Sequence, residues 1–244
     1  MLLSVLILCF QFCLFFYHIA CFNVNNSKSY GEQTSANEVP YVTLVTTESL
    51  HVWCIGALIT EIYVITSARC VYTDKGFVEI IGSKLEHNLL IPCKFFVHPS
   101  YKNLTDFKST SLYDIALAKL ELKVRFNNYI NIINIDKDPW LINEPERLCN
   151  VIGFNSIKTK YDTIRIGEFY AKYGPNQCKC IKSNYVTCLR TNTNGLCIGE
   201  NGSLLVCKHK LIGIHSKRLP ADICNNSKIL HSVPECNNKF SDEI

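Results

Sequence analysis

Short runs of β-branched and other apolar residues, separated by turn-forming residues, recur along the chain after a polar segment that ends near Asn37. Apolar stretches of this length, spaced regularly, are typical of strands in a sandwich or barrel. The clearest runs are Tyr41–Thr47, Ile62–Ala68, Phe77–Gly82, Ile115–Leu120, Val151–Phe154, Ser203–Cys207 and Lys210–Ser216. Only the tail from Val233 favours a short helix. The pattern therefore predicts an all-β protein.

The first 22 residues contain no Lys, Arg, Asp or Glu, and small residues lie near Ala20 and Cys21. Such a segment is typical of a secretory signal, which we expect over residues 1–21. The alternative is a retained membrane anchor, because the apolar run is long enough to span a bilayer. The whole chain has 244 residues, of which 48% are hydrophobic. The part that follows the expected signal is the size of one β-rich domain. We place a short polar segment at residues 22–28 and this domain at residues 29–244.

Charge and cysteine content narrow the class of protein. The net charge is +4 without a block of Lys or Arg, which argues against nucleic-acid binding. The 14 cysteines fit an oxidising compartment, and none shows the paired C-x-x-C spacing of a zinc site. We therefore expect a secreted, extracellular protein with disulfides, no metal, no cofactor and no membrane contact after signal cleavage. N-glycosylation sequons begin at Asn25, Asn103, Asn201 and Asn225.

Three separate motifs carry a resemblance to a known family. The segments Cys54–Cys70, Tyr113–Leu120 and Cys197–Cys207 resemble, in this order, those that supply the general base, the orienting aspartate and the nucleophile in the chymotrypsin/trypsin family of serine proteases. The resemblance implies two six-stranded antiparallel β-barrels for residues 29–244. It also implies that residues 22–28 are a pro-segment, which a cut near Lys28 would release.

The residues at the three catalytic positions depart from the family pattern. Arg69 stands where the family has its histidine, and a guanidinium has no lone pair with which to accept a proton. Asn201 stands where the family has its serine, and an amide nitrogen is a very poor nucleophile. Asp114 matches the aspartate, and Gly199 matches the glycine that lines the oxyanion hole. We therefore expect a degenerate triad and no catalysis.

The substrate pocket also departs from the pattern. The resemblance places Gly195 at the base of the specificity pocket and aligns Ser216, Lys217 and Arg218 with the family's Ser-Trp-Gly. A long cationic side chain then stands where the family has an open glycine. No preference for basic substrates follows from these residues.

By the same resemblance, most cysteines have partners. The implied disulfides are Cys54–Cys70, Cys149–Cys207, Cys178 or Cys180 with Cys188, and Cys197–Cys224. Four cysteines are left without a family partner: Cys21, Cys93, Cys236 and one of Cys178 and Cys180. A pair among them, or a link to another chain, stays open.

Three hypotheses concern the former active site, each beside a plainer alternative. Asp114 accepts a charge-assisted hydrogen bond from Arg69, or it persists as a buried carboxylate with local donors that suits the fold. The lysine and arginine side chains of this region form a basic groove that binds an acidic protein or glycan, or these side chains are ordinary surface charges. The groove would comprise Arg69, Lys208, Lys210, Lys217 and Arg218. A glycan at Asn201 caps the cleft, or that sequon is unused.

We expect a non-catalytic secreted homolog that binds an extracellular protein as a decoy, cofactor or modulator of proteases or their inhibitors. One alternative is a weak serine-type endopeptidase or other hydrolase with a non-standard site. Another is a structural or toxin-like scaffold that presents loops.

Overall fold

The computed structural model describes the chain in segments: 32–47, 53–71, 73–81, 89–101, 113–138, 140–141, 144–154, 164–173, 187–190, 202–218 and 230–233. The expected signal, anchor and pro-segment, as well as the expected helix after Val233, lie outside these residues. Within them, no helix is long and apolar enough to cross a membrane.

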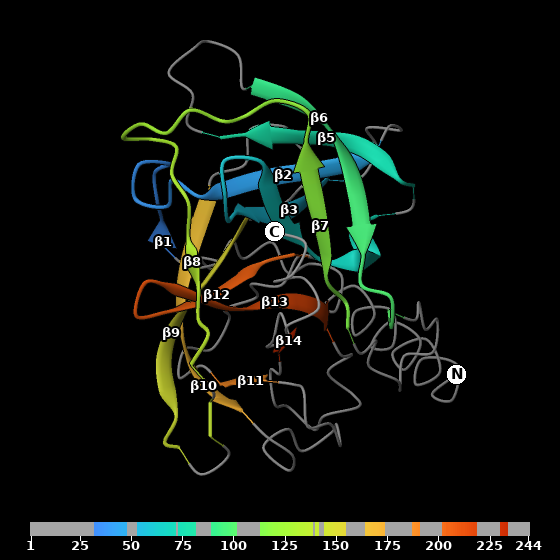
Figure 1. The fold of residues 1–244 in the computed structure, drawn as a ribbon. Helices are drawn as coiled ribbons and strands as arrows, with labels where there is room; N and C mark the ends of the chain where they lie inside the picture. The colour runs from blue at the N-terminus through green and yellow to red at the C-terminus, as the bar shows by residue number, and fades with distance from the viewer. Residues whose placement is uncertain are drawn as a thin grey trace, which may run out of the picture.

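Six strands of the N-terminal half form a closed barrel, shown in blue to green in Figure 1. The barrel order is β2-β3-β4-β7-β6-β5, and every neighbouring pair is antiparallel. The strands are β2 (Val42–Thr47), β3 (Trp53–Leu58), β4 (Tyr63–Thr66), β5 (Lys75–Ile80), β6 (Leu89–Val97) and β7 (Ala116–Leu120).

The C-terminal half, together with the short N-terminal strand β1, forms a second sheet, most of which lies below the barrel in Figure 1. Its strands are β1 (Glu32–Gln33), β8 (Asn134–Ile135), β9 (Arg147–Phe154), β10 (Ile164–Tyr173), β11 (Thr187–Arg190), β12 (Leu204–Cys207), β13 (Lys210–Arg218) and β14 (Leu230–Val233). Because β9 pairs with both β10 and β12, the pairings of β9, β10, β11, β14, β13 and β12 run in a closed circuit. In the described residues the only helix is the 3-10 turn η1 (Ala68–Cys70), so the all-β prediction is confirmed.

Two layers of apolar side chains hold the molecule together. One fills the first barrel and includes Val64 and Val78, and the other includes Ile65 of the first barrel and Ile152 and Leu204 of the second sheet. A third cluster of buried side chains, which includes Val151 and Phe169, lies within the second sheet. Neighbouring residues of a strand point to opposite faces, so burial of both Val64 and Ile65 means that β4 is covered on both sides. This explains the unbroken apolar run in the sequence.

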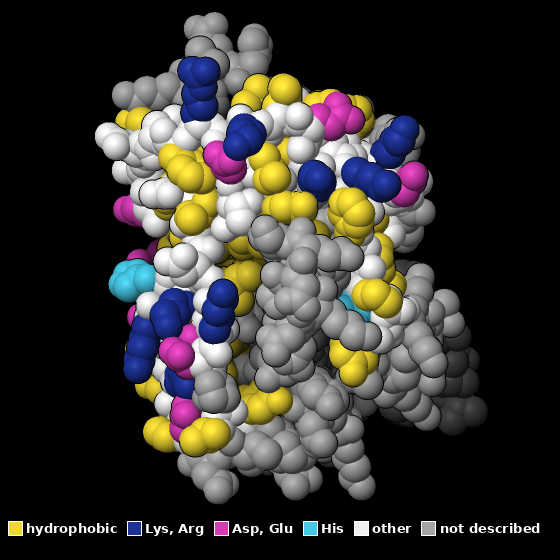
Figure 2. All heavy atoms as spheres, in the orientation of Figure 1, with side chains coloured by type: hydrophobic (Ala, Val, Ile, Leu, Met, Phe, Trp, Pro, Cys, Tyr) yellow, Lys and Arg dark blue, Asp and Glu magenta, His cyan; other side chains and the backbone are white. Residues whose placement is uncertain are grey.

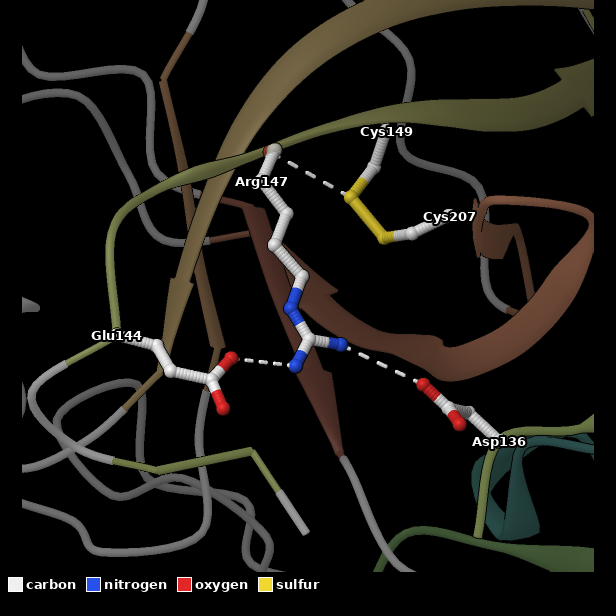
Figure 3. The surroundings of a disulfide bond; sticks show 5 residues. All are labelled: Asp136, Glu144, Arg147, Cys149 and Cys207. Atoms are coloured by element: carbon white, nitrogen blue, oxygen red, sulfur yellow. Dashed lines mark hydrogen bonds and ion pairs between the residues drawn. A yellow bond between two sulfur atoms is a disulfide. The ribbon is translucent and has the colours of Figure 1, made fainter. Parts of the chain in front are cut away.

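Arg147, at the start of β9, binds the segment that connects the two halves of the protein. Its guanidinium donates to Glu144 and to Asp136, the latter at 3.4 Å, and lies over the Trp140 ring at 4.3 Å. Figure 3 shows Glu144 and Asp136 on either side of this guanidinium, beside the disulfide between Cys149 and Cys207. These contacts set the position of the chain as it enters β9.

Candidate functional site

Asp114 lies at the end of a turn that leads into β7. Tyr113, the residue before it, has a positive φ of 60°, a conformation that bulky residues rarely adopt. The Tyr113 ring stacks on the His98 ring with centroids 4.7 Å apart, and the backbone N–H of Ile115 donates to the carbonyl of Tyr113 at 2.8 Å. This tight turn directs the Asp114 side chain into the protein, where it is fully buried.

The Asp114 carboxylate is held by two short hydrogen bonds to the segment after β4. The Ser67 hydroxyl and the backbone N–H of Arg69 both donate to its Oδ1 atom, each at 2.8 Å. Ser67 is itself fully buried. Ser67 was not among the predicted site residues, and its only signal in the sequence is a small hydroxyl residue at a strand end, two residues before Arg69.

Arg69 is the middle residue of η1, and its guanidinium faces the same carboxylate. The Nε atom lies 3.8 Å from Asp114 Oδ2, which is an ion-pair distance but is longer than a hydrogen bond. The side chain of Arg69 is 21% exposed, whereas that of Asp114 is 0% exposed. The sequence suggested a charge-assisted hydrogen bond between the two side chains; the structure shows an ion pair between them, and the Arg69 backbone and Ser67 donate hydrogen bonds to the carboxylate.

This arrangement has a clear chemical consequence. A catalytic base must accept a proton from the nucleophile, and a guanidinium has no lone pair to do so. The Asp114 carboxylate can orient and neutralise the cation beside it. It cannot turn that cation into a base.

Gly202, the first described residue after Asn201, packs against the first barrel. Gly202, directly after Asn201, has φ +86°, and a Cβ atom there would lie 2.1 Å from the Ile55 carbonyl oxygen. The same oxygen accepts a hydrogen bond from the Thr66 hydroxyl at 2.7 Å. The N–H of Gly202 donates to the His215 carbonyl at 3.0 Å, so this point joins β3, β4 and β13. The structure thereby brings the end of the third motif against the first.

Several sequence-predicted positions cannot be placed in this geometry. Asn201, Gly199 and Gly195 lie outside the described residues, as do the sequon asparagines Asn25, Asn103 and Asn225. The backbone of Lys217 and Arg218 belongs to β13 and pairs with His231 and Leu230 of β14, with a register shift after His215.

The basic groove proposed from the sequence does not form from all its members. Lys210 begins β13 and Lys217 lies near its other end, so about 23 Å of extended strand separates them. Lys210 is also engaged elsewhere, because it donates to Asp136 at 3.3 Å and to Asp138 at 3.1 Å. The assignment of Lys208 and Lys210 to the groove is therefore wrong. Residues only a few positions apart in the sequence, such as Lys210 and Lys217, lie far apart when the chain between them is an extended strand.

The disulfides follow the pattern that the resemblance implies, as far as the described residues show them. Cys54 pairs with Cys70, which ties β3 to η1 beside Arg69, and Cys149 pairs with Cys207, which ties β9 to β12. Cys188 is disulfide-bonded to a residue outside the described part, where Cys178, Cys180, Cys197 and Cys224 lie. Cys93 is a free, buried thiol inside the first barrel.

Comparison with known proteins extends over most of the chain. The Trypsin family model matches residues 29–238. The β-fibrinogenase mucrofibrase-1 of Protobothrops mucrosquamatus is 24% identical over 200 residues, covering 76% of this chain and 74% of its own length. Vaa serine proteinase homolog 1 of Vipera ammodytes ammodytes is also 24% identical, over 201 residues that cover 76% of this chain and 75% of its own.

Solved structures agree with the fold. Kallikrein-related peptidase 10 superposes with a TM-score of 0.64 over 87% of this chain and 96% of its own, at 20% sequence identity. At that identity the similarity concerns the arrangement of the strands.

Proposed function

The chain belongs to the trypsin family, and from that premise we propose that it is a secreted, non-catalytic homolog that works by binding another extracellular protein. The observation that carries the proposal is Arg69 at the base position, with its Nε atom 3.8 Å from the buried Asp114 carboxylate. The site keeps the element that orients the base and lacks the base itself.

The magnitude of the loss supports this proposal. Removing the base or the nucleophile of a serine protease triad lowers turnover by about 2 × 10⁶, roughly 8–9 kcal/mol of transition-state stabilisation. In this chain both positions are substituted, by Arg69 and Asn201. Binding and backbone donors alone leave little rate enhancement over water.

The remaining features are those of a binding domain. The barrel core, the disulfides Cys54–Cys70 and Cys149–Cys207, and the hydrogen bonds that hold the buried Asp114 carboxylate form a rigid scaffold for loops. We propose that the partner is an active extracellular protease or a protease inhibitor, for which the homolog acts as decoy, cofactor or modulator. The name of one relative, a snake venom serine protease homolog of Macrovipera lebetinus, is in keeping with a role outside the cell.

The test begins with hydrolysis of a broad peptide library by the purified secreted protein, with and without tryptic clipping near Lys28. The matched variant carries Arg69→His and Asn201→Ser, which restores a base and a hydroxyl nucleophile. We expect no turnover above a mock preparation for the natural protein. Turnover that is lost on Asp114→Asn would overturn the proposal in favour of a hydrolase with a non-standard site.

Partner binding is the second arm of the test. We expect a reversible complex with at least one member of a panel of trypsin-like proteases and their protein inhibitors, measured by interferometry on the immobilised natural protein. An Arg69→Ala variant shows whether the former active site takes part. Absence of both turnover and complexes would overturn the modulator role and leave a structural or toxin-like scaffold.

A further inference from the structure

Three lysines lie side by side on the outer face of the first barrel. In the strand register Lys75 of β5 is directly opposite Lys94 of β6, and Lys94 is directly opposite Lys119 of β7. Directly opposed residues of an antiparallel pair point to the same face of the sheet. All three side chains are exposed. They form one line across three strands, which we call the lysine row.

The described part of the chain does not pair the lysine row with carboxylates. Among the described residues no carboxylate lies within ion-pair distance of Lys75, Lys94 or Lys119. Neighbouring strands are about 4.8 Å apart, so the row spans only about 10 Å, close to one screening length at physiological salt. Like charges placed directly opposite on a sheet destabilise it. The fold therefore bears a repulsion that an external anion would relieve.

Exposed apolar side chains flank the row on the same face. Phe96 is 36% exposed and Leu90 is 42% exposed; both alternate with Lys94 along β6 and so share its face. The Lys94 ammonium lies 5.4 Å from the centroid of the Phe96 ring. Tyr63 of β4, opposite Lys119, continues the row as a part-buried aromatic residue. Figure 2 shows dark blue side chains over the upper barrel, where β5, β6 and β7 lie in Figure 1, with yellow side chains and a few magenta ones beside them.

We propose that the lysine row and Phe96 form a binding surface for a sulfated polysaccharide. Sulfate groups are anions carried along a flexible chain, which suits a short line of cations on a smooth barrel wall. The faces of sugar rings present C–H groups, which pack well on an exposed aromatic ring. The surface is distinct from the former catalytic site, because Lys119 is five residues along the chain from Asp114, about 17 Å if extended.

The barrel topology favours this occupant over an acidic peptide strand. The strands β5, β6 and β7 are all paired on both sides within a closed barrel, so no free edge exists there for a peptide to pair with. A membrane fits less well, because Leu90 and Phe96, the apolar residues that flank the row, belong to a strand of the barrel wall.

The first experiment measures the affinity of the purified, secreted full-length protein for heparin in about 0.15 M salt. The row variant carries Lys75→Gln, Lys94→Gln and Lys119→Gln. The control variant carries Lys137→Gln, Lys172→Gln and Lys208→Gln, which remove the same number of charges from the connecting segment and the second sheet. Each near-surface cation contributes substantially to binding a polyanion, so we expect the row variant to bind about tenfold to a hundredfold more weakly. The control should change less than about threefold by the same reasoning.

Further measurements separate the alternatives. Phe96→Ala should weaken heparin binding while leaving its salt dependence unchanged, because the ring carries no charge. The unfolding temperature of the row variant should equal or exceed that of the natural protein, because the repulsion is removed. This also shows that the variant is folded, and Lys94→Gln alone provides a milder second test.

The proposal fails if heparin does not bind, or if the row and control variants lose affinity equally. Preferential binding to polyglutamate or to phosphatidylserine vesicles, with weak binding to heparin, would replace the polysaccharide by an acidic protein or a membrane. None of these results depends on peptide hydrolysis, so they are independent of whether the former active site retains turnover.

Discussion

The buried hydrogen bond from Ser67 to Asp114 leads to a sharp prediction about stability. Ser67→Ala removes the hydroxyl that donates to Asp114 Oδ1 at 2.8 Å, at a site where both residues are fully buried. A hydrogen bond to a charged group contributes about 1.5–3 kcal/mol, and the carboxylate has no solvent to replace it. For a domain of this size each kcal/mol lowers the unfolding temperature by about 2–4 °C, so we expect a decrease of about 3–12 °C.

The matched control is the neighbouring residue Thr66, which is also fully buried. Its hydroxyl donates to the uncharged Ile55 carbonyl at 2.7 Å, so Thr66→Val removes a similar bond without a charged acceptor. We expect that change to cost about 0.5–1.5 kcal/mol. Both are measured by denaturant unfolding with the disulfides intact, followed by tryptophan fluorescence.

A double-mutant cycle isolates the pair itself. Ser67→Ala and Asp114→Asn are measured singly and together, and we expect a coupling free energy above about 1 kcal/mol. The reasoning is refuted if the coupling is below about 0.5 kcal/mol, or if Ser67→Ala costs no more than Thr66→Val. In that case the Asp114 carboxylate would be held by the Arg69 backbone and other contacts without help from Ser67.

Three further predictions follow from other contacts. Gly202→Ala should destabilise the fold by more than about 3 kcal/mol and reduce the secreted yield, because its Cβ would lie 2.1 Å from the Ile55 oxygen at φ +86°; an unchanged yield and unfolding midpoint would contradict this. The hydrogen bond and charge of Lys210 lower the pKa of Asp138 below its ordinary 3.8, so this pair stabilises the fold above that pH and ceases to do so as the pH falls through the lowered pKa. The free energy of unfolding of Lys210→Met should therefore depend less steeply on pH below about pH 5 than that of the natural protein, and equal slopes would argue against the pair. Burial raises the pKa of the Cys93 thiol to about 12, so iodoacetamide near pH 8 should label it, as seen by mass spectrometry, only after unfolding.

The strands that the sequence predicted well are those buried on one or both faces. The run Tyr41–Thr47 became β2, Ile115–Leu120 gave β7, and Lys210–Ser216 lies within β13. The long strand β6 was missed, because Pro92 and Lys94 interrupt its apolar pattern. Its other seven residues are apolar, and because Leu90 and Phe96 lie on the solvent-exposed outer face, the strand lacks the alternation of apolar and polar residues that marks a strand buried on one side. β10 was missed as well, with charged residues such as Arg165, Glu168 and Lys172 among its ten residues.

The residues of the candidate site likewise include some that the sequence predicted and some that it did not. Arg69 and Asp114 were found because each stands inside a local motif with a recognisable spacing. Ser67 has no such pattern, and its role exists only because the turn at Tyr113 brings Asp114 back from 47 residues further along the chain. The assignment of Lys208 and Lys210 to the groove failed for the converse reason, since closeness in sequence says little about closeness in space along an extended strand.

The amino-acid sequence alone determined the all-β class and the family motifs, and it predicted a cation at the position of the catalytic base, because these depend on residue type and on local spacing. Tertiary structure alone decided which groups hold the Asp114 carboxylate, where Lys210 is engaged, and that Lys75, Lys94 and Lys119 share one line. These contacts, and the alignment of the three lysines, depend on strand register. Register is set by barrel closure and by packing of the whole core, and a shift of one residue would send every side chain to the opposite face.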